Sequence, residues 1–349
     1  MEKYRQFADE TTGVHPFVPV WVNHRISTVG LISNVVMGPV AILRLVLLSV
    51  PLLLLWIAFL LTSLIPVGAV RQPLRRLLYG SFCRLALVLL GYLHIPEAQA
   101  DFRRLRIRPP SREYSRGPLG HAGHGSLVLC NFTSVVDVVY LTRRVAPLFA
   151  VAHGDGSISL LSPLSMMQRS LKFVGPMTGK GQYPHLAAAC DAALASSLGP
   201  VVFFPEGGKS NGTCVLEWDA KAMAPKDKKG AEALGEILKK RTWLAGIAHP
   251  RQGAYSGPHT VFGGAFHLFL LSLRVYNYMK VDVVAPADVG GSLKDKEGLQ
   301  DMGAQCRTLI GRAMGGTLVA TTASRALEFE KYWRETYKKK RYVQKKKGA

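Results

Sequence analysis

The group of polar residues best suited to chemistry follows a short apolar run at 201–204. The run VVFF continues through Pro205 into EGGKSNG at 206–212, which contains an acid, three glycines, a lysine and two small polar side chains. Backbone N–H groups in a glycine-rich turn, together with a lysine, commonly bind an anion such as a phosphate. Surface turns use similar residues, but here Glu206 sits at the end of a predicted strand and the chain becomes apolar again at 215–218. The candidate binding residues of this loop are Glu206, Gly207, Gly208, Lys209, Ser210, Asn211 and Gly212.

A second polar group follows the apolar run SLVLC at 126–130. The next residues, NFTSVVD at 131–137, open what the sequence predicts to be a helix, with Asn131 or Ser134 as its cap and Asp137 one turn further on. By itself this pattern is an ordinary helix start. Its polar side chains are nevertheless candidates for binding or catalysis, namely Asn131, Thr133, Ser134 and Asp137.

Together the two segments resemble the motifs of the glycerophospholipid acyltransferases. The stretch NFTSVVD looks like that family's Asn-His-x-Ser-x-x-Asp, and FFPEGGKSNG looks like its Phe-Pro-Glu-Gly-Thr-x-Ser-x-Gly, in the same order and about 70 residues apart. The N-terminal MEKYRQF and GVHPFVPVW at 13–21 are similar to fungal lysophosphatidic acid acyltransferases with oleoyl-CoA preference. The resemblance extends over most of the chain, and FFPEG with SNG is its specific part.

This resemblance implies a reaction and roles for individual residues. The reaction is transfer of an acyl group from acyl-CoA to the free hydroxyl of a lysophospholipid, with lysophosphatidic acid as the first expected acceptor. In the family a histidine acts as general base, an aspartate orients it, and the Phe-Pro-Glu-Gly residues hold the glycerol phosphate. Asp137 matches the orienting acid, and Glu206, Gly207, Ser210 and Gly212 match the acceptor-binding loop.

The sequence departs from the family pattern at the histidine itself. That position is Phe132, whose side chain cannot accept a proton, and Gly208 stands where the family has threonine. The family's arginine and late proline motifs are not clearly present around 174–181 or 245–250, where Lys180 is a candidate for the missing positive charge.

Three explanations of Phe132 stay open. Another base can act, either Asp137 through a water or His153 at the end of the predicted strand LFAVAH. Six further histidines have weaker claims: His121, His124, His185, His249, His259 and His267. Alternatively, orientation of the substrates alone supports a slow reaction. The third explanation is a catalytically impaired protein that binds acyl-CoA or lysolipid and organises membranes.

An uncharged apolar stretch predicts a membrane anchor near the N-terminus. The 26 residues from Leu45 to Val70 carry no charge, enough for a helix of about 39 Å. Pro51, Pro66 and Arg44 interrupt the apolar region, so a hairpin in one leaflet competes with a single span. The following segment, 77–95, is predicted to be an interfacial helix that continues the anchor.

Beyond residue 125 the pattern changes to alternating short apolar strands and helices, which is typical of an α/β domain. The expected strands are 126–130, 146–152, 171–174, 201–204, 243–247 and 281–285, and the expected helices are 185–197, 230–240 and 299–314. The resemblance implies a mixed sheet flanked by helices. The expected organisation is an N-terminal segment at 1–25, anchor and interfacial helix at 26–95, linker at 96–125, acyltransferase-like domain at 126–290, and C-terminal helix and basic tail at 291–349.

Charge and cysteine content indicate the surroundings of the protein. The formal charge of +21 predicts an anionic partner, and the apolar stretches favour an anionic membrane over nucleic acid. The five cysteines show neither paired spacing nor a zinc pattern, which favours a reduced, cytosol-facing domain. We expect an endoplasmic reticulum membrane or lipid droplet protein, with Lys346 and Lys347 resembling a dilysine retrieval signal. No metal or bound cofactor is expected, and acyl-CoA would be a co-substrate. The sequence has no serine-hydrolase, nucleotide or HExxH motif.

Overall fold

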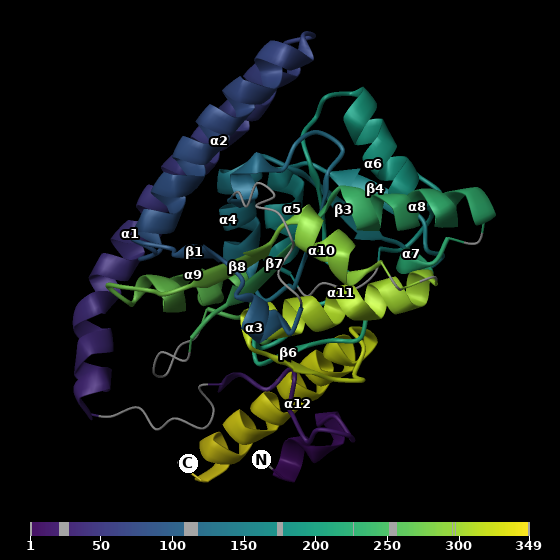
Figure 1. Cartoon of the computed structure of the whole chain (residues 1–349). Coiled ribbons are helices and arrows are strands. Elements are labelled where there is room, and N and C mark those ends of the chain that lie inside the picture. The colour runs from purple at the N-terminus through teal and green to yellow at the C-terminus, as the bar shows by residue number, and fades with distance from the viewer. Residues whose placement is uncertain are drawn as a thin grey trace.

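A seven-stranded mixed sheet forms the centre of the protein in the computed structural model (Figure 1). The structure describes residues 2–20, 28–107, 118–172, 177–225, 227–250, 257–294, 296 and 298–347. The strands of the sheet are β1 (Glu97–Gln99), β2 (Leu127–Cys130), β3 (Leu148–Ala152), β4 (Ile158–Leu161), β5 (Val201–Phe203), β7 (Thr242–Ala248) and β8 (Lys280–Val284). They lie in the order β1-β8-β7-β2-β5-β3-β4, and only the pairs β7–β8 and β3–β4 are antiparallel. The predicted mixed sheet flanked by helices is therefore confirmed.

Helices cover both faces of the sheet. Those of the globular part are α3 (Phe102–Leu105), η3 (Leu119–His121), α4 (Val135–Val145), α5 (Pro163–Ser170), α6 (Leu186–Ala195), α7 (Ala220–Met223), α8 (Lys228–Lys240), α9 (Gly264–Ser272), α10 (Pro286–Ser292) and α11 (Leu299–Met314). Val128 and Cys130 belong to the core that contains α4, whereas Leu127 and Leu129 belong to the core that contains α6, α8 and α11. Because neighbouring residues of a strand point to opposite faces, a strand covered on both sides must be apolar throughout.

Most of the expected elements are present, with some additions. The strands expected near 126–130, 146–152, 201–204, 243–247 and 281–285 and the helices near 185–197, 230–240 and 299–314 all form. Of the expected strand 171–174, residues 171 and 172 follow α5 and are not in a strand, and 173–174 lie outside the described residues. Strand β4 and helices α5, α9 and α10 are among the elements not anticipated, and the expected linker contains β1, α3 and η3.

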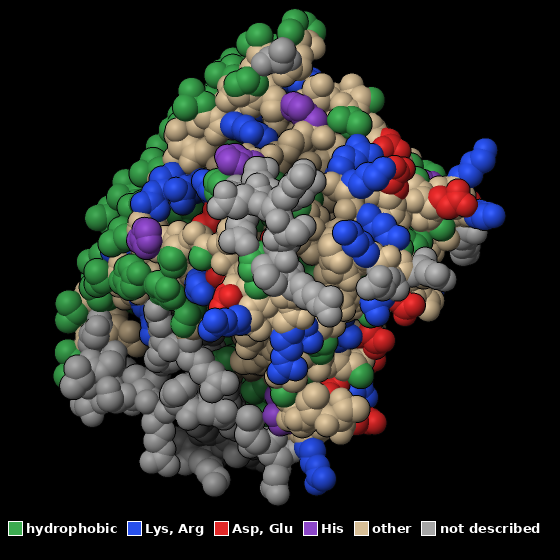
Figure 2. Space-filling view, in the orientation of Figure 1, with side chains coloured by type: hydrophobic (Ala, Val, Ile, Leu, Met, Phe, Trp, Pro, Cys, Tyr) green, Lys and Arg blue, Asp and Glu red, His purple; other side chains and the backbone are tan. Residues whose placement is uncertain are grey.

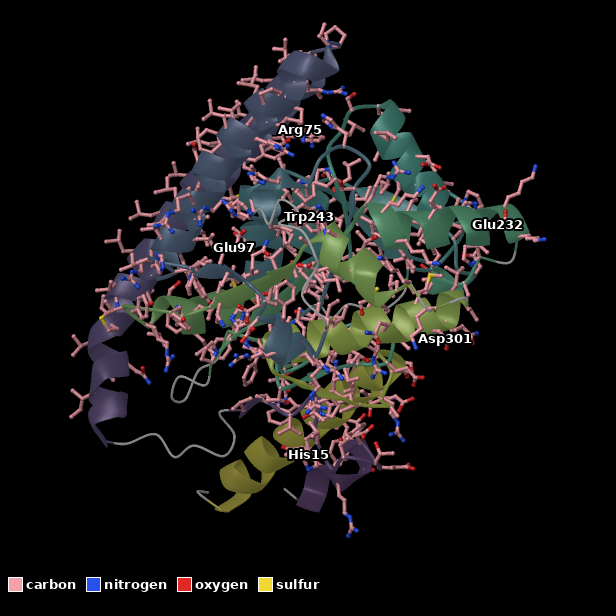
Figure 3. The ribbon with its side chains drawn as sticks, in the orientation of Figure 1. His15, Arg75, Glu97, Glu232, Trp243 and Asp301 are labelled. Atoms are coloured by element: carbon pink, nitrogen blue, oxygen red, sulfur yellow. The ribbon has the colours of Figure 1, made fainter. Side chains whose placement is uncertain are left out.

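Residues at the start of that segment are joined to α4 by a polar network. Glu97, labelled in Figure 3, forms an ion pair with Arg144 at 2.6 Å and accepts the hydroxyl of Tyr140 at 2.6 Å and the N–H of Leu119 at 2.7 Å. A partly buried carboxylate needs such donors to offset its desolvation. The network therefore holds the edge strand β1 and η3 against α4.

Two long helices form an apolar side of the molecule. Helix α1 (Thr28–Ser63) and helix α2 (Gly68–Leu89) lie side by side and are joined through a short segment that contains Pro66 (Figure 1). Pro51 lies inside α1 and does not end it. Residues Asn34–Ser63 are long and apolar enough to cross a membrane, which makes them a candidate anchor. Hydrophobic side chains cover this side of the molecule in Figure 2.

The two ends of the chain pack together below the sheet. The 3-10 helix η1 (Glu2–Phe7) contacts α12 (Ser324–Lys347), with the rings of Tyr4 and Trp333 stacked at 5.4 Å. Next to them, β6 (Cys214–Val215) and β9 (Thr317–Leu318) form a small parallel sheet. Leu216 belongs to the same apolar cluster as these rings, so the termini support the chain just after the glycine-rich loop.

Candidate functional site

Three parallel strands bring the candidate residues to one edge of the sheet. Strand β2 lies between β5 and β7 and is parallel to both, so the carboxyl ends of all three strands meet. The segment 131–137 follows β2, the loop 204–212 follows β5, and His249 follows β7. In an open α/β sheet this edge is the usual position of a binding site.

Asp137 is buried at the start of α4, where it takes part in a capping box. Its Oδ2 accepts the N–H of Thr133 at 2.7 Å, the hydroxyl of Thr133 at 2.7 Å and the N–H of Ser134 at 2.9 Å. The Ser134 hydroxyl in turn accepts the N–H of Val136 at 3.1 Å. These bonds fix the orientation of the carboxylate, whose second oxygen, Oδ1, faces β7.

That second oxygen contacts a histidine which sequence reasoning had ranked among the weaker candidates. The Nε2 of His249 lies 2.8 Å from Oδ1 of Asp137, and the side chains are 1% and 0% exposed. The ring of Tyr92 stands edge-on to His249 at 6.5 Å. The one sequence signal for this pair is the position of His249 just after a predicted strand. The sequence does not show that this strand lies next to the strand that precedes Asp137.

Phe132 faces an apolar pocket. Its ring stacks on Phe204 at 4.5 Å, and its side chain is 1% exposed. Its backbone N–H donates to Oε1 of Glu206 at 3.2 Å, and its carbonyl accepts the N–H of Ser210 at 3.0 Å. The two sequence motifs are therefore in direct contact.

Glu206 is buried and joins two parts of the chain. Besides the N–H of Phe132, it accepts the N–H of Leu216 at 3.0 Å through Oε2. Desolvation raises the pKa of this carboxyl to about 8, although the two N–H donors act in the opposite direction.

Three further side chains of the glycine-rich loop bond within the protein. The Nζ of Lys209 lies 2.9 Å from the carbonyl of Ser170 and 2.9 Å from Nδ1 of His259. The hydroxyl of Ser210 donates to the carbonyl of Cys214 at 3.1 Å. The amide of Asn211 donates to the carbonyls of His15 and Val18 at 2.8 Å each, which attaches the N-terminal segment, where Figure 3 labels His15, to the loop.

Lys209 belongs to a buried group of bases. His259 stacks on His267 at 4.4 Å, and its Nε2 lies 3.0 Å from the carbonyl of Phe262. Burial lowers the pKa of Lys209 to about 7, while burial and the nearby lysine lower the pKa of His259 to about 3. With Nε2 donating to a carbonyl, the neutral ring of His259 accepts from Lys209 through Nδ1.

An apolar pocket of about 520 Å³ lies beside Phe132 and Glu206. Phe132, Phe203, Phe204 and Met166 supply apolar lining, together with residues 150–152 of β3. Polar residues of its wall include Glu206, Glu217, Asp219, Lys221, Thr322 and Ser324. A mostly apolar pocket of this size with a few polar groups is typical of small-molecule sites.

The remaining candidates occupy separate positions. His153 bonds through Nε2 to the hydroxyl of Ser159 at 2.8 Å and through Nδ1 to the carbonyl of Gly179 at 3.1 Å. The side chain of Lys180 is exposed. The amide of Asn131 bridges to β7, since its nitrogen donates to the carbonyl of Ile247 at 2.9 Å and its oxygen accepts the N–H of the same residue at 2.7 Å.

The glycines of the loop differ in their backbone demands. Gly207 and Gly212 have positive φ values of 66° and 76°. A Cβ on Gly212 would lie 2.9 Å from Pro258, so this residue needs glycine for both conformation and space. Gly208, in contrast, is not among the described glycines with a positive φ. Within the described residues, no cluster of three or more His, Cys, Asp and Glu side chains is arranged to hold a metal ion.

Comparison with solved structures finds a protein of similar fold. No family model matches the sequence. No curated protein matches it either. The fold is similar to the crystal structure of the 1-acyl-sn-glycerophosphate (LPA) acyltransferase PlsC from Thermotoga maritima, with a TM-score of 0.41 and 12% identity over 81% of this chain and 95% of that one. The function proposed for this protein therefore depends on its own residues.

Proposed function

We propose that this protein is a membrane-attached O-acyltransferase that moves a fatty acyl group from acyl-CoA to the hydroxyl of a lysophospholipid. Lysophosphatidic acid, giving phosphatidic acid, is the first acceptor to test. The reaction needs no metal or bound cofactor, because a thioester already contains an activated acyl group. The acceptor hydroxyl must lose its proton as it attacks the thioester carbonyl, and coenzyme A leaves as the thiol.

The observation that carries this proposal is the meeting of both motifs at one pocket. Phe132 and Glu206 lie about 70 residues apart in sequence, are bonded at 3.2 Å, and line the same apolar pocket. Apolar walls fit the acyl chain of a donor or acceptor, and the buried Asp137 lies one helical turn beyond Phe132. A lipid-compatible pocket lined by Glu206, with the buried Asp137 nearby, supports the proposal.

The proposed location is the cytosolic surface of the endoplasmic reticulum or of lipid droplets. The exposed apolar side chains of α1 and α2 support attachment to lipid, and the charge of +21 supports contact with anionic headgroups and with coenzyme A. All five cysteines are free thiols, as a reducing compartment requires.

A second candidate function is lipid binding without catalysis. Phe132 favours it, because a phenylalanine stacked on Phe204 fills the wall of the pocket with an inert ring. In that case the protein binds acyl-CoA or lysolipid and organises the membrane surface. The pocket and the anchor serve both functions equally, so the distinction rests on turnover.

The test is acyl transfer from labelled oleoyl-CoA to lysophosphatidic acid by the purified full chain in mixed micelles. We expect labelled phosphatidic acid from the parent and a loss of turnover in Asp137→Ala and Glu206→Ala. The matched control is Glu232→Ala, an exposed glutamate on α8 (Figure 3). Thermal unfolding of each variant separates lost chemistry from lost structure.

Two results would argue against catalysis. Turnover absent from the parent but present in Phe132→His identifies a disabled enzyme and favours the binding function. Absence of product in every variant, with lysophosphatidylcholine and lysophosphatidylethanolamine as well as lysophosphatidic acid, rejects acyl transfer.

A further inference from the structure

The carboxylate of Asp137 has a partner on each of its oxygens. Three donors from Thr133 and Ser134 occupy Oδ2, and the His249 ring occupies Oδ1 at 2.8 Å. A carboxylate has about four lone-pair sites, and four donors already bond to this one, which leaves little opportunity for a substrate hydroxyl to bond there. Asp137 is therefore better suited to hold an imidazole than to remove a proton itself.

This contact fixes the tautomer of His249. A carboxylate can only accept, so the proton of the neutral ring is on Nε2 and the lone pair is on Nδ1. Among the described residues, Nδ1 has no hydrogen-bond partner although the ring is buried. A buried nitrogen without a hydrogen-bond partner destabilises the folded protein. Such atoms are therefore rare, and each one calls for an explanation such as a role in catalysis.

Gly257 provides the space for this ring. A Cβ built on Gly257 would overlap Nδ1 of His249, so only glycine at this position allows the ring to lie where it does. The ring is held by Asp137 on one side, and the side with Nδ1 faces a backbone without a side chain.

We infer that His249 is the general base of the proposed acyl transfer, an inference that rests on that function. Its Nδ1 removes the proton from the acceptor hydroxyl while the oxygen attacks the thioester carbonyl. As the C–O bond forms and the C–S bond breaks, the proton passes from Nδ1 to the departing sulfur, which leaves as coenzyme A thiol. Asp137 stabilises the imidazolium that exists between these two transfers.

The ring nitrogens of the other buried histidines have different hydrogen-bond partners. Both ring nitrogens of His153 have partners, Ser159 and Gly179, and both ring nitrogens of His259 have partners, Lys209 and Phe262. Nε2 of His267 is also unpartnered among the described residues, but its ring stacks on His259 instead of bonding to an acid. His249 combines an acid partner on one nitrogen with a lone pair on the other.

The inference has a structural requirement. The side chain of His249 is 1% exposed and does not line the pocket beside Phe132. The acceptor hydroxyl must therefore approach Nδ1 from the side of the ring on which Gly257 lies. Gly257→Ala should abolish turnover, because its Cβ would take the space of Nδ1.

The experiment compares His249→Gln with two other histidine variants in the oleoyl-CoA assay. His153→Gln tests the rival base, and His94→Gln, at an exposed position, is the control. We expect His249→Gln to lower kcat at least about 100-fold, the usual contribution of a general base, with KM for oleoyl-CoA changed less than about threefold. Turnover in His249→Gln should be partly restored by adding Phe132→His, which a purely structural role of His249 would not produce.

The possible failures are distinguishable. If the parent turns over and His249→Gln keeps its kcat, the assignment of the base is wrong while the acyltransferase function stands. If the parent shows no turnover with any acceptor, the proposed function fails first. If His249→Gln does not fold, Gly257→Ala is measured in its place. A folded Gly257→Ala variant with the kcat of the parent overturns the assignment, and a folded variant that has lost turnover supports it.

Discussion

One carboxylate joins the two motif segments: Oε1 of Glu206 accepts the N–H of Phe132 at 3.2 Å, and Oε2 accepts the N–H of Leu216 at 3.0 Å. The acid therefore connects the loop after β2 with the chain after β6. Removing it would leave two buried N–H groups without an acceptor, which costs about 1–3 kcal/mol for each group. Glu206 therefore stabilises the folded protein whether or not it contacts a substrate. The pH dependence of the free energy of unfolding measures this contribution.

The free energy of unfolding should depend on pH through Glu206. Burial raises the pKa of this carboxyl from 4.5 to about 8, so the folded protein holds the proton more tightly than the unfolded chain does. The resulting stability is complete below pH 4.5 and is lost as pH rises towards 8. Urea unfolding across this range should show that the free energy of unfolding of the parent, relative to that of Glu206→Gln, falls as pH rises. Parallel curves would contradict the raised pKa, and Glu232→Gln is the exposed control.

Lys209 should produce the opposite trend at higher pH. Burial lowers its pKa from 10.5 to about 7, so the unfolded chain binds the proton more tightly than the folded protein does. The free energy of unfolding of the parent, relative to Lys209→Met, should therefore increase as pH rises from 7 to 10.5. Chemical unfolding at several pH values measures this difference. No change over the range would mean that the buried amine is better solvated than its contacts with Ser170 and His259 indicate.

Arg44 should couple helix α1 to the globular part. From within α1, its Nη1 donates to the carbonyls of Ser272 and Arg274 at 3.2 and 2.6 Å, at the end of α9. Hydrogen bonds from a charged group contribute about 1.5–3 kcal/mol, and a cation is also favourable at a helix C-terminus. Arg44→Met should increase amide hydrogen exchange in α9 more than in β2 or β5. The exposed Arg103→Met is the control, and equal exchange in both variants would argue against this coupling.

The exposed apolar side of α1 should bind lipid. Leu53 and Trp56 are 57% and 52% exposed, and the many apolar neighbours on this surface have no covering element among the described residues. Replacing both by lysine should reduce co-sedimentation with phosphatidylcholine vesicles. The control is a double lysine variant at Leu194 and Leu327, which are 43% and 46% exposed and lie outside α1 and α2. Equal losses in both variants would indicate that hydrophobicity in general, and not this surface, determines binding.

The elements of the fold were largely predictable because their signals are local. The expected strand and the helix start at NFTSVVD correspond to β2 and α4, since an apolar run followed by a serine cap and an acid at the third helical position specifies both. Helix α11 agrees in both limits with the expected 299–314, because its apolar spacing is regular and Gly315 ends it in the left-handed conformation. Strand β4 was missed because ISLL resembles many short apolar segments and is paired only through β3.

The sequence by itself determined that an apolar helix lies near the N-terminus and which strands carry the two polar motifs. Both follow from residue type and spacing over a few turns of chain. Only the tertiary structure decided that His249 meets Asp137, because 112 residues separate them and no local pattern encodes the parallel pairing of β2 with β7. It also decided that Lys209, Ser210 and Asn211 bond within the protein, since the partners of a loop depend on which distant segments the sheet and the chain termini bring against it.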